Sequence, residues 1–356
     1  MILCKKNVSI FFVFFGYGHM HPTFFKKMIV QVPVADLRYQ PKANDSTLKL
    51  PTSDLKNPLQ ITQLLLGEHV MAHEEFFDEN KTRWLKINTL QQQFYYIPDG
   101  WHGYPGWIEA DQLIDVDTFP DHHIVVNQYF ADVFDKNHQT LLTVSLGTRL
   151  VGIQISPDLW QLTLPDGRIG FIQNTDVYII DPIIHETTDE LRQNIITASL
   201  KFLGNYYSWG GRSAQQDQKI SSVDCSALVS LSFLAQGLQL PRMSHEQFLH
   251  SQKIEHGSDL QPGDLIFFVS ISKRFTRMDH VMLYLGHDQI IEATPAGKEV
   301  VRIISSKDRL GKPCNMICAG DILNDNGYKF YIYFGSFLQD PLLLQKLRDN
   351  ALRRNY

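Results

Sequence analysis

The chain reads Ser222-Val223-Asp224-Cys225 at the start of an apolar segment that continues through Leu228, Val229, Phe233 and Leu234. Ser222 or Asp224 can serve as the N-cap of a helix, because a side-chain oxygen there accepts hydrogen bonds from free N–H groups of the first turn. Cys225 then falls in the first turn of a buried helix. The helix dipole can lower a cysteine pKa from ~8.5 to about 3.5–7.5 at that position. The stretch indicates either an activated thiol or an inert buried cysteine.

The segments around this helix predict an α+β fold. Residues 188–203 carry apolar side chains at helical spacing. A loop rich in glycine and aromatic residues follows at 204–211. After Gln261-Pro262-Gly263-Asp264, strand patterns cover residues 265–269, 280–285 and 290–293. A helix followed by an antiparallel sheet is typical of α+β proteins.

His280 is a candidate general base for such a thiol. It opens the predicted strand 280–285, in which alternation places His280, Met282 and Tyr284 on one face. A polar residue that opens an otherwise apolar strand is expected at the rim of the sheet. A half-exposed surface histidine would give the same pattern.

Glu292 is a candidate orienting partner for the imidazole, because a base needs an acceptor that fixes its tautomer. A three-residue turn at 286–288 would pair Leu285 with Gln289 and His280 with Thr294. Glu292 would then lie one diagonal step from His280 on the same face. A rim carboxylate exposed to water is the alternative.

The N-terminal half shows two regions of short strands separated by turns, at 28–118 and 119–182, which predict two small β-barrels. Trp84 and Trp160 occupy similar places in the two regions, which suggests a weak internal duplication. The expected domains are therefore 1–27 as an extension, 28–118 and 119–182 as barrels, 186–336 as the catalytic domain and 337–356 as a tail.

Composition excludes several classes of protein. The chain has 356 residues and a formal charge of −5, which argues against a nucleic-acid-binding face. Cys314 and Cys318 have no second Cys or His pair at zinc-site spacing, so we expect two ordinary thiols and neither metal nor cofactor. No stretch reaches the ~20 apolar residues of a membrane-spanning helix.

The first 27 residues allow two interpretations. An apolar run at 8–15 follows Lys5 and Lys6, as in a signal peptide, but no small-x-small cleavage site follows it. Residues 1–27 are otherwise a loose extension or an upstream translation artefact. We therefore expect a cytoplasmic protein, with export to the periplasm or cell surface as the alternative.

Taken together, the motifs of residues 190–335 resemble those of the NlpC-type cell-wall cysteine peptidases in order and spacing. The two preceding regions look like bacterial SH3-like domains. The whole arrangement resembles the γ-D-glutamyl-L-diamino acid endopeptidases of peptidoglycan recycling. The motifs that carry the resemblance are Tyr207-Ser208-Trp209-Gly210-Gly211, Asp224-Cys225-Ser226-Ala227-Leu228-Val229, Leu240-Pro241-Arg242, Leu260-Gln261-Pro262-Gly263-Asp264-Leu265 and His280-Val281.

The resemblance implies a papain-like core acting on stem peptides of the L-Ala-γ-D-Glu-diaminopimelate type, in a protein that we expect to be a monomer. Cys225 would attack the amide after γ-D-glutamate, and His280 would take up and return the proton. The family usually has a second histidine where this chain has Glu292. This departure leaves the third catalytic role open.

The resemblance also implies substrate-binding residues. The first SH3-like domain of such enzymes selects peptides with a free N-terminal L-alanine, which assigns Tyr104 and either Glu74 or Glu75 to the amine. Asp224 would help to hold the ammonium. Tyr104 otherwise packs between domains, and Met243 replaces an acidic residue often seen after Arg242. Further candidates for the groove are Trp209, Ser226 and Ser244.

Two other functions fit the same residues. Glu292 favours a non-catalytic, peptidoglycan-binding protein with a degenerate peptidase fold, whereas the presence of both Cys225 and His280 argues against it. A Cys–His pair also supports acyltransferase or amidase chemistry. Product masses separate these reactions, since a transferase leaves an acylated amine where a hydrolase leaves a free acid.

Overall fold

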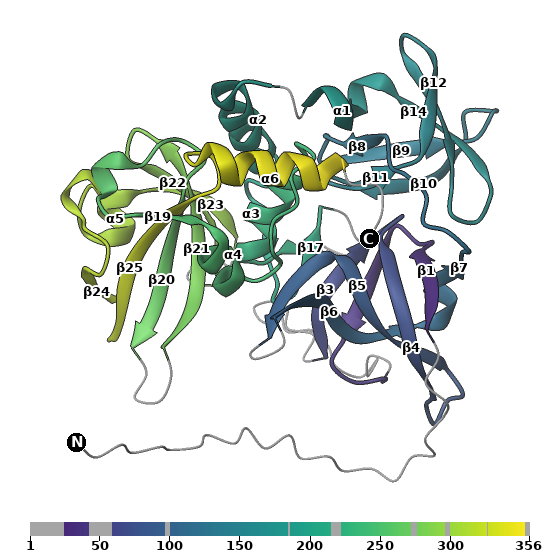
Figure 1. The fold of residues 1–356 in the computed structure, drawn as a ribbon, viewed down its shortest axis with the longest axis horizontal. Coiled ribbons are helices and arrows are strands. Elements are labelled where there is room, and N and C mark those ends of the chain that lie inside the picture. Colours follow the sequence, from purple (N-terminus) through teal and green to yellow (C-terminus); the bar gives the residue numbers. More distant parts are fainter. Residues whose placement is uncertain are drawn as a thin grey trace.

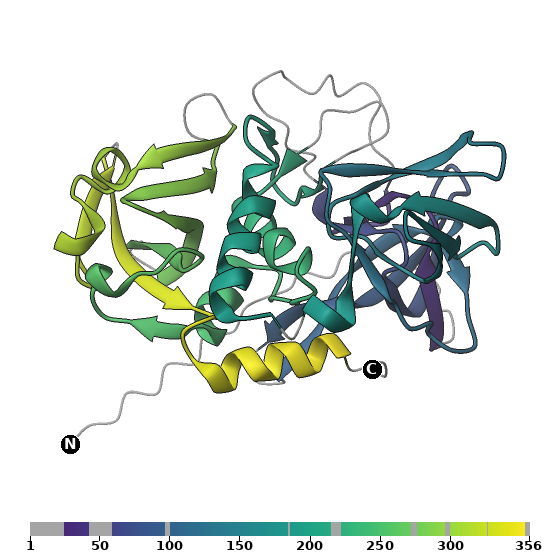
Figure 2. The same ribbon diagram turned by 90° about the horizontal axis from the view of Figure 1, so that it is seen from above.

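The computed structural model describes residues 25–42, 59–96, 100–183, 186–214, 222–271, 276–295, 300–325 and 327–352. The apolar run at 8–15, most of the predicted extension at 1–27 and the last four residues of the predicted tail lie outside these ranges. Figure 1 and Figure 2 show β-rich regions from the N-terminal half on one side and a sheet from the C-terminal half on the other, with α2 and α3 between them.

The first β-rich region is an antiparallel sheet in the order β3-β2-β6-β5-β4-β1-β7. Its apolar core includes Val30, Leu37, Leu64 and Ile87. Alternation along the strands sends these side chains inward and leaves polar neighbours outside. The strands are β1 (Lys26–Val30), β2 (Val34–Arg38), β3 (Gln60–Leu65), β4 (His69–Phe77), β5 (Arg83–Tyr96), β6 (Gly100–Glu109) and β7 (Leu113–Asp115).

The second β-rich region consists of two smaller antiparallel sheets, ordered β10-β9-β14-β13-β12 and β11-β8-β15. In both regions a strand carrying a buried tryptophan, Trp84 or Trp160, pairs with the strand that follows it, and a single 3₁₀ turn and a short strand come next. This repeated succession agrees with the predicted duplication. The strands are β8 (Ile124–Val126), β9 (Phe130–Phe134), β10 (Thr140–Ser145), β11 (Arg149–Leu150), β12 (Gly152–Ser156), β13 (Leu159–Thr163), β14 (Ile169–Gln173) and β15 (Val177–Ile179).

The C-terminal region begins with the expected helix, α2 (Thr188–Leu200), which follows the short helix α1 (Ile180–Ile183). Thr187 and Glu190 form a reciprocal capping box at the start of α2, which satisfies free N–H groups of its first turn. Short strands β16 (Tyr206–Tyr207), β17 (Arg212–Ser213) and β18 (Ser222–Val223) then lead into α3 (Cys225–Leu234). The segment preceding Cys225 is therefore held by strand pairing.

The C-terminal sheet has the order β19-β25-β20-β21-β22-β23, and β24 pairs with β25. One face of β21 packs Val281 and Leu283 against α3, and the other packs Met282 and Tyr284 into a second core. The remaining elements are α4 (Ser244–His250), β19 (Gln252–Ile254), β20 (Leu265–Ile271), β21 (Thr276–Gly286), β22 (Gln289–Ala293), β23 (Val301–Ser305), α5 (Ser306–Leu310), β24 (Ile322–Asp325), β25 (Tyr328–Ser336) and α6 (Pro341–Leu352).

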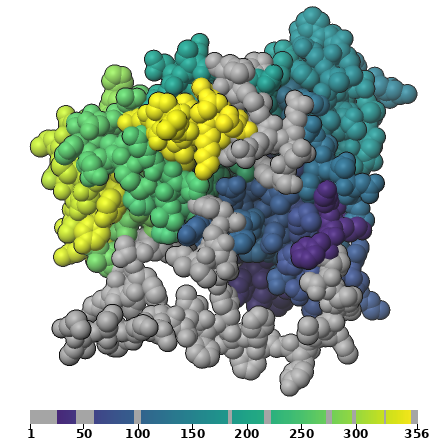
Figure 3. Space-filling view, viewed as in Figure 1, coloured from purple at the N-terminus to yellow at the C-terminus, as the bar shows by residue number. Residues whose placement is uncertain are grey.

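The last helix, α6, lies on the surface of the molecule across the C-terminal region (Figure 3). Its Leu344 and Leu347 are buried in the same core as α3. Arg348 Nη2 donates to the carbonyl oxygen of Glu186 at 2.6 Å, near the start of α2. Most of the predicted tail therefore packs as a helix against the catalytic region.

Candidate active site

Cys225 is the first residue of α3, as its sequence context predicts. The carboxylate of Asp224 caps the helix by accepting from the backbone N–H of Ala227 at 2.8 Å. Every residue of α3 is buried, and Cys225 itself retains 8% of its exposure. The sulfur therefore lies at the positive end of a helix dipole in a largely dry environment.

His280 lies in the middle of β21, so the expectation that it opens a strand at the sheet rim is wrong. β21 begins at Thr276 and has β20 and β22 as neighbours. Phe268 pairs with His280, but Val269 pairs with Met278, which leaves Asp279 as the extra residue of a bulge. A bulge redirects the side chains beside it, and His280 forms a hydrogen bond with Cys225.

Glu292 contacts the other side of the imidazole. His280 Nε2 and Glu292 Oε2 are 2.8 Å apart, and the glutamate side chain is fully buried. Because Nε2 is engaged by the carboxylate, Nδ1 is the ring nitrogen left for the sulfur of Cys225. The structure thus brings the three residues expected to be catalytic into one chain of contacts.

The turn that delivers Glu292 differs from the expected one. The loop between β21 and β22 consists of His287 and Asp288, both with positive φ, and Gly286 pairs with Gln289. A register shift after Tyr284 compensates, so Leu283 still faces Ile291. A two-residue turn with a bulge therefore replaces the expected three-residue turn and leaves the relation between His280 and Glu292 unchanged.

Two arginines that the sequence did not reveal also bind Glu292. Arg302, directly opposite Glu292 on β23, donates to Oε1 from Nε at 3.1 Å and from Nη2 at 2.8 Å. Arg309 Nε, from α5, donates to Oε2 at 3.0 Å. The carboxylate is therefore surrounded by cationic donors, which is why a buried glutamate can stay ionised.

These contacts shift both pKa values in opposite directions. Burial alone would lower the pKa of His280, but hydrogen bonds and charge interactions with Cys225 and Glu292 outweigh it and raise that pKa to about 9. Burial would raise the pKa of Glu292, but His280, Arg309 and Arg302 hold it well below its usual range. The imidazolium is thus the stable form below about pH 9 and is lost as the pH rises further.

In Arg302→Gln, the pH at which activity is lost on the alkaline side should rise by about half a pH unit. Without the positive charge of Arg302, the Glu292 carboxylate favours the imidazolium more strongly. The pH profile of kcat/KM measures this shift. Arg168→Gln is the matched control, because it removes the same charge from a surface hairpin of the second region. An unchanged or lower alkaline limit in Arg302→Gln would show that Arg302 does not tune the base.

Tyr207 is a further residue at the site that the sequence did not single out within its motif. Burial raises the pKa of its phenol, and the charges of Cys225 and Asp224 raise it further. The phenol therefore stays protonated and can donate a hydrogen bond near the sulfur. Its position in the sequence, immediately before Ser208-Trp209, is the signal that could have identified it as a site residue.

The residues expected to bind substrate lie in different surroundings. Trp209 is 42% exposed beside the site, and its carbonyl oxygen accepts from Gln60 of the first sheet at 3.5 Å. Tyr104 reaches the catalytic region, where its hydroxyl lies 3.5 Å from Met243 Sδ. Gly103 lets the backbone before Tyr104 pass close to Thr89, because a Cβ at position 103 would lie 2.0 Å from the carbonyl oxygen of Thr89.

Three other candidates are engaged inside the protein. Both oxygens of Asp224 accept hydrogen bonds from protein groups, including two from Arg242. Ser226 Oγ lies between Asp224 and Arg242, and Ser244 Oγ donates to the carbonyl oxygen of Met278 at 3.3 Å. Their contacts with substrate remain predictions.

Glu74 and Glu75 lie on β4 of the first sheet. Each forms a salt bridge with a cross-strand neighbour on β5, Lys86 at 3.0 Å for Glu74 and Arg83 for Glu75. Glu68, in the turn between β3 and β4, contacts the catalytic region, where its Oε1 accepts from Arg212 at 2.7 Å. The role of Glu74 or Glu75 at a substrate amine also remains a prediction.

Within the described residues, no group of three or more His, Cys, Asp or Glu side chains is arranged to hold a metal ion. Cys314 is buried, whereas Cys318 is exposed with its sulfur 3.5 Å from His256 Nδ1. Across the same described part of the chain, the helices fall short of the length and apolarity that membrane crossing requires.

Residues 204–312, which hold Cys225, His280 and Glu292, match the NlpC/P60 family. The chain contains an NlpC/P60 domain. A crystal structure of an NlpC/P60 family protein from Bacillus cereus superposes with a TM-score of 0.65 at 23% identity, covering 88% of this chain and 99% of that one. The shared fold thus includes regions before the NlpC/P60 domain.

Named relatives extend over more than the NlpC/P60 domain. A γ-D-glutamyl-L-lysine dipeptidyl-peptidase of Bacillus cereus is 26% identical over 246 residues, which are 67% of this chain and 68% of the relative. Dipeptidyl-peptidase 6 of Lysinibacillus sphaericus is 26% identical over 229 residues, or 60% and 78% of the two chains. The SH3-like character of the two N-terminal regions remains a prediction.

Proposed function

We propose that this protein is a cysteine endopeptidase that hydrolyses the γ-D-glutamyl-L-diamino acid bond of peptidoglycan stem peptides with a free N-terminal L-alanine. The observation that carries the proposal is the continuous contact from Cys225 at a helix N-terminus through His280 to a buried, ionised Glu292. The name of the Bacillus cereus relative, a γ-D-glutamyl-L-lysine dipeptidyl-peptidase, supports the choice of bond. Recycling of murein peptides in the cytoplasm is the role that we propose for this activity.

The proposed reaction has two steps. The Cys225 thiolate attacks the γ-carbonyl carbon of D-glutamate, and the C–N bond breaks as the His280 imidazolium gives its proton to the departing amine of the diamino acid. Water then attacks the thioester carbonyl while His280 takes a proton from it, and the C–S bond breaks. This releases the γ-carboxylic acid, which loses its proton to solvent, and restores the thiolate–imidazolium pair. Glu292 holds the ring in place through both steps.

The negative charge that develops on the carbonyl oxygen during the attack must be stabilised by hydrogen-bond donors. The backbone N–H of Cys225 lies in the first turn of α3, where N–H groups have no intrahelical partner. We assign it the first place in the oxyanion hole, as the usual electrostatic device of acyl transfer. The protonated phenol of Tyr207 is the second candidate donor.

The direct test is to incubate the protein with L-Ala-γ-D-Glu-diaminopimelate, and with the lysine analogue, and to weigh the products. Hydrolysis yields the dipeptide L-Ala-γ-D-Glu and the free diamino acid. An added amine that becomes acylated would identify a transferase instead. Absence of cleavage of every stem peptide would favour a binding protein and contradict the proposal.

Tyr104→Phe should lower kcat/KM for free-amine peptides about tenfold while changing that for N-acetylated peptides little, because one hydrogen bond to a charged ammonium is lost. Parallel assays of the two peptides measure the difference, and Glu74→Gln and Glu75→Gln are assayed in the same way. Tyr178→Phe, at an exposed tyrosine of the second region, is the matched control. Equal cleavage of free and blocked peptides by the parent enzyme would refute selection for the amine.

A further inference from the structure

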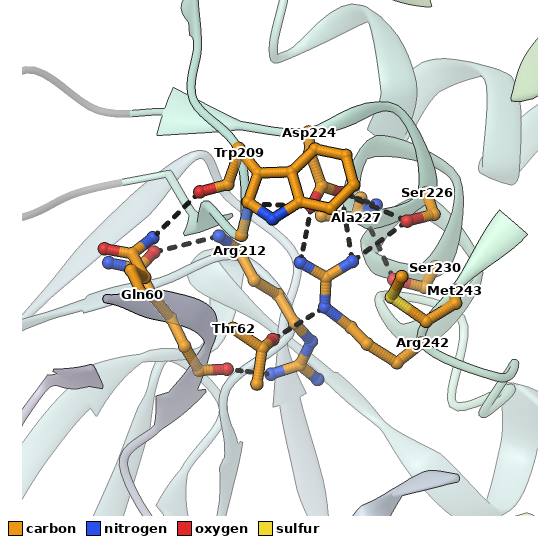
Figure 4. A network of polar contacts seen from close by, with 12 residues as sticks. Gln60, Thr62, Trp209, Arg212, Asp224, Ser226, Ala227, Ser230, Arg242 and Met243 are labelled. Atoms are coloured by element: carbon orange, nitrogen blue, oxygen red, sulfur yellow. Dashed lines mark hydrogen bonds and ion pairs between the residues drawn. The ribbon is translucent and has the colours of Figure 1, made fainter. Parts of the chain in front are cut away.

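A buried chain of polar groups joins the first sheet to the helix that carries Cys225 (Figure 4). The Nε of Arg242 donates to Thr62 Oγ1 on β3 at 2.6 Å. The same guanidinium donates from Nη1 to Asp224 Oδ1 at 3.0 Å and from Nη2 to Asp224 Oδ2 at 2.7 Å. Asp224 is the N-cap of α3. One side chain thus links residue 62 with the residue before the nucleophile.

This series of hydrogen-bonded groups continues into the first sheet. The Thr62 hydroxyl in turn donates to Gln92 Oε1 at 2.8 Å. The amide of Gln92 then donates to the Gln63 carbonyl oxygen at 2.8 Å and to Glu68 Oε2 at 3.1 Å. Each group donates in the same direction, from Arg242 toward Glu68, an order in which successive hydrogen bonds polarise one another favourably.

The side chains of this hydrogen-bonded series are buried, so the loss of one contact is costly. Thr62 is fully buried, and Arg242, Asp224 and Gln92 retain 6% of their exposure or less. A guanidinium cannot be left unpaired in such a place without a large desolvation cost. Arg242 lies within electrostatic range of Cys225 as well as of Asp224. A fixed guanidinium therefore offsets a carboxylate that would otherwise oppose the thiolate next to it.

We propose that the first sheet sets the reactivity of Cys225 through Thr62 and Arg242. Thr62 fixes the guanidinium in the orientation that neutralises Asp224 and holds the first turn of α3. Thr62 and Arg242 are positioning residues in this scheme, which rests on the proposed function in taking Cys225 as the nucleophile. The first sheet then contributes to the reactivity of the catalytic centre, in addition to any role in substrate selection.

The test is Thr62→Val, which keeps the size of the side chain and removes the hydroxyl. The rate of alkylation of Cys225 by iodoacetamide is followed against pH in the full chain by mass spectrometry of the Cys225 peptide, which separates its reaction from that of the exposed Cys318. We expect alkylation of Cys225 at neutral pH to be about tenfold slower than in the parent. We also expect kcat on the stem peptide to fall while KM changes less than twofold.

Two variants control this experiment. Thr62→Ser retains the hydroxyl and should restore the parent profile. Thr187→Val removes a capping hydroxyl from α2 and should leave the alkylation profile unchanged. A folded Thr62→Val protein with the parent profile, or an equal shift in Thr62→Val and Thr187→Val, would overturn the proposal.

Arg242→Lys keeps the inference testable if Thr62→Val does not fold. Lysine keeps the charge but cannot hold both oxygens of Asp224 and Thr62 in one plane, so alkylation at neutral pH should again be slower. A parent-like profile in this variant would also overturn the proposal. Alkylation requires no peptide, so a protein that cleaves no stem peptide but shows these shifts would refute the proposed function and leave this inference standing.

Discussion

Cys225→Ala should lower kcat/KM for the stem peptide by about 10⁴-fold or more, because removal of the nucleophile leaves only binding and the oxyanion donors. Circular dichroism and thermal melting should match the parent closely, since the change removes one sulfur at the end of a helix. Product formation over long incubations, followed by mass spectrometry, provides the range that this measurement needs.

Cys318→Ala is the matched control for this experiment. Cys318 also has an imidazole neighbour, His256, but it is exposed and lies outside any helix. Its loss should leave kcat/KM within twofold of the parent. Residual activity above one hundredth of the parent in Cys225→Ala would mean that another group attacks the substrate.

Glu292→Gln should lower kcat by about 100-fold and move the alkaline limit of activity downward from about pH 9. The sign follows from the charge, because a neutral amide no longer favours the imidazolium, and its pKa falls. Arg302 and Arg309 also lose their counter-charge. Breaking a buried ion pair costs about 3–5 kcal/mol, so the free energy of unfolding should fall measurably.

The pH profile separates a catalytic effect of Glu292 from a purely structural one. The two effects are measured by pH-dependent kinetics and by urea denaturation of the same preparation. Glu190→Gln, which weakens the capping box of α2, is the control for lost stability alone. A Glu292→Gln enzyme with reduced stability but with the parent alkaline limit would show that Glu292 does not act through His280.

Local patterns predicted the parts of the site that depend on local geometry. Ser222 or Asp224 before an apolar helical run placed Cys225 in the first turn, and strand alternation placed Glu292 beside His280. The turn at His287 and Asp288 was misjudged because both residues adopt positive φ without being glycine or asparagine. The compensating bulge could not be read from the strand itself, since it depends on the pairing partner.

The features that sequence did not reveal are contacts between distant segments. The bulge at Asp279 exists only through the pairing of β21 with β20. Arg242 and Thr62 are 180 positions apart, and no spacing rule joins them. Asp224 looked available for a substrate ammonium because the sequence gives no sign that Arg242 occupies its oxygens. Long-range packing decided each of these cases.

The coupling of Cys225 to His280 is tested most directly by the pH dependence of Cys225 alkylation in the parent protein and in His280→Ala. In the parent, alkylation should stay fast at neutral and mildly acidic pH, because the imidazolium stabilises the thiolate. In His280→Ala, alkylation should be slow at neutral pH and become fast only at alkaline pH. Superimposable profiles for the two proteins would contradict the proposed pair.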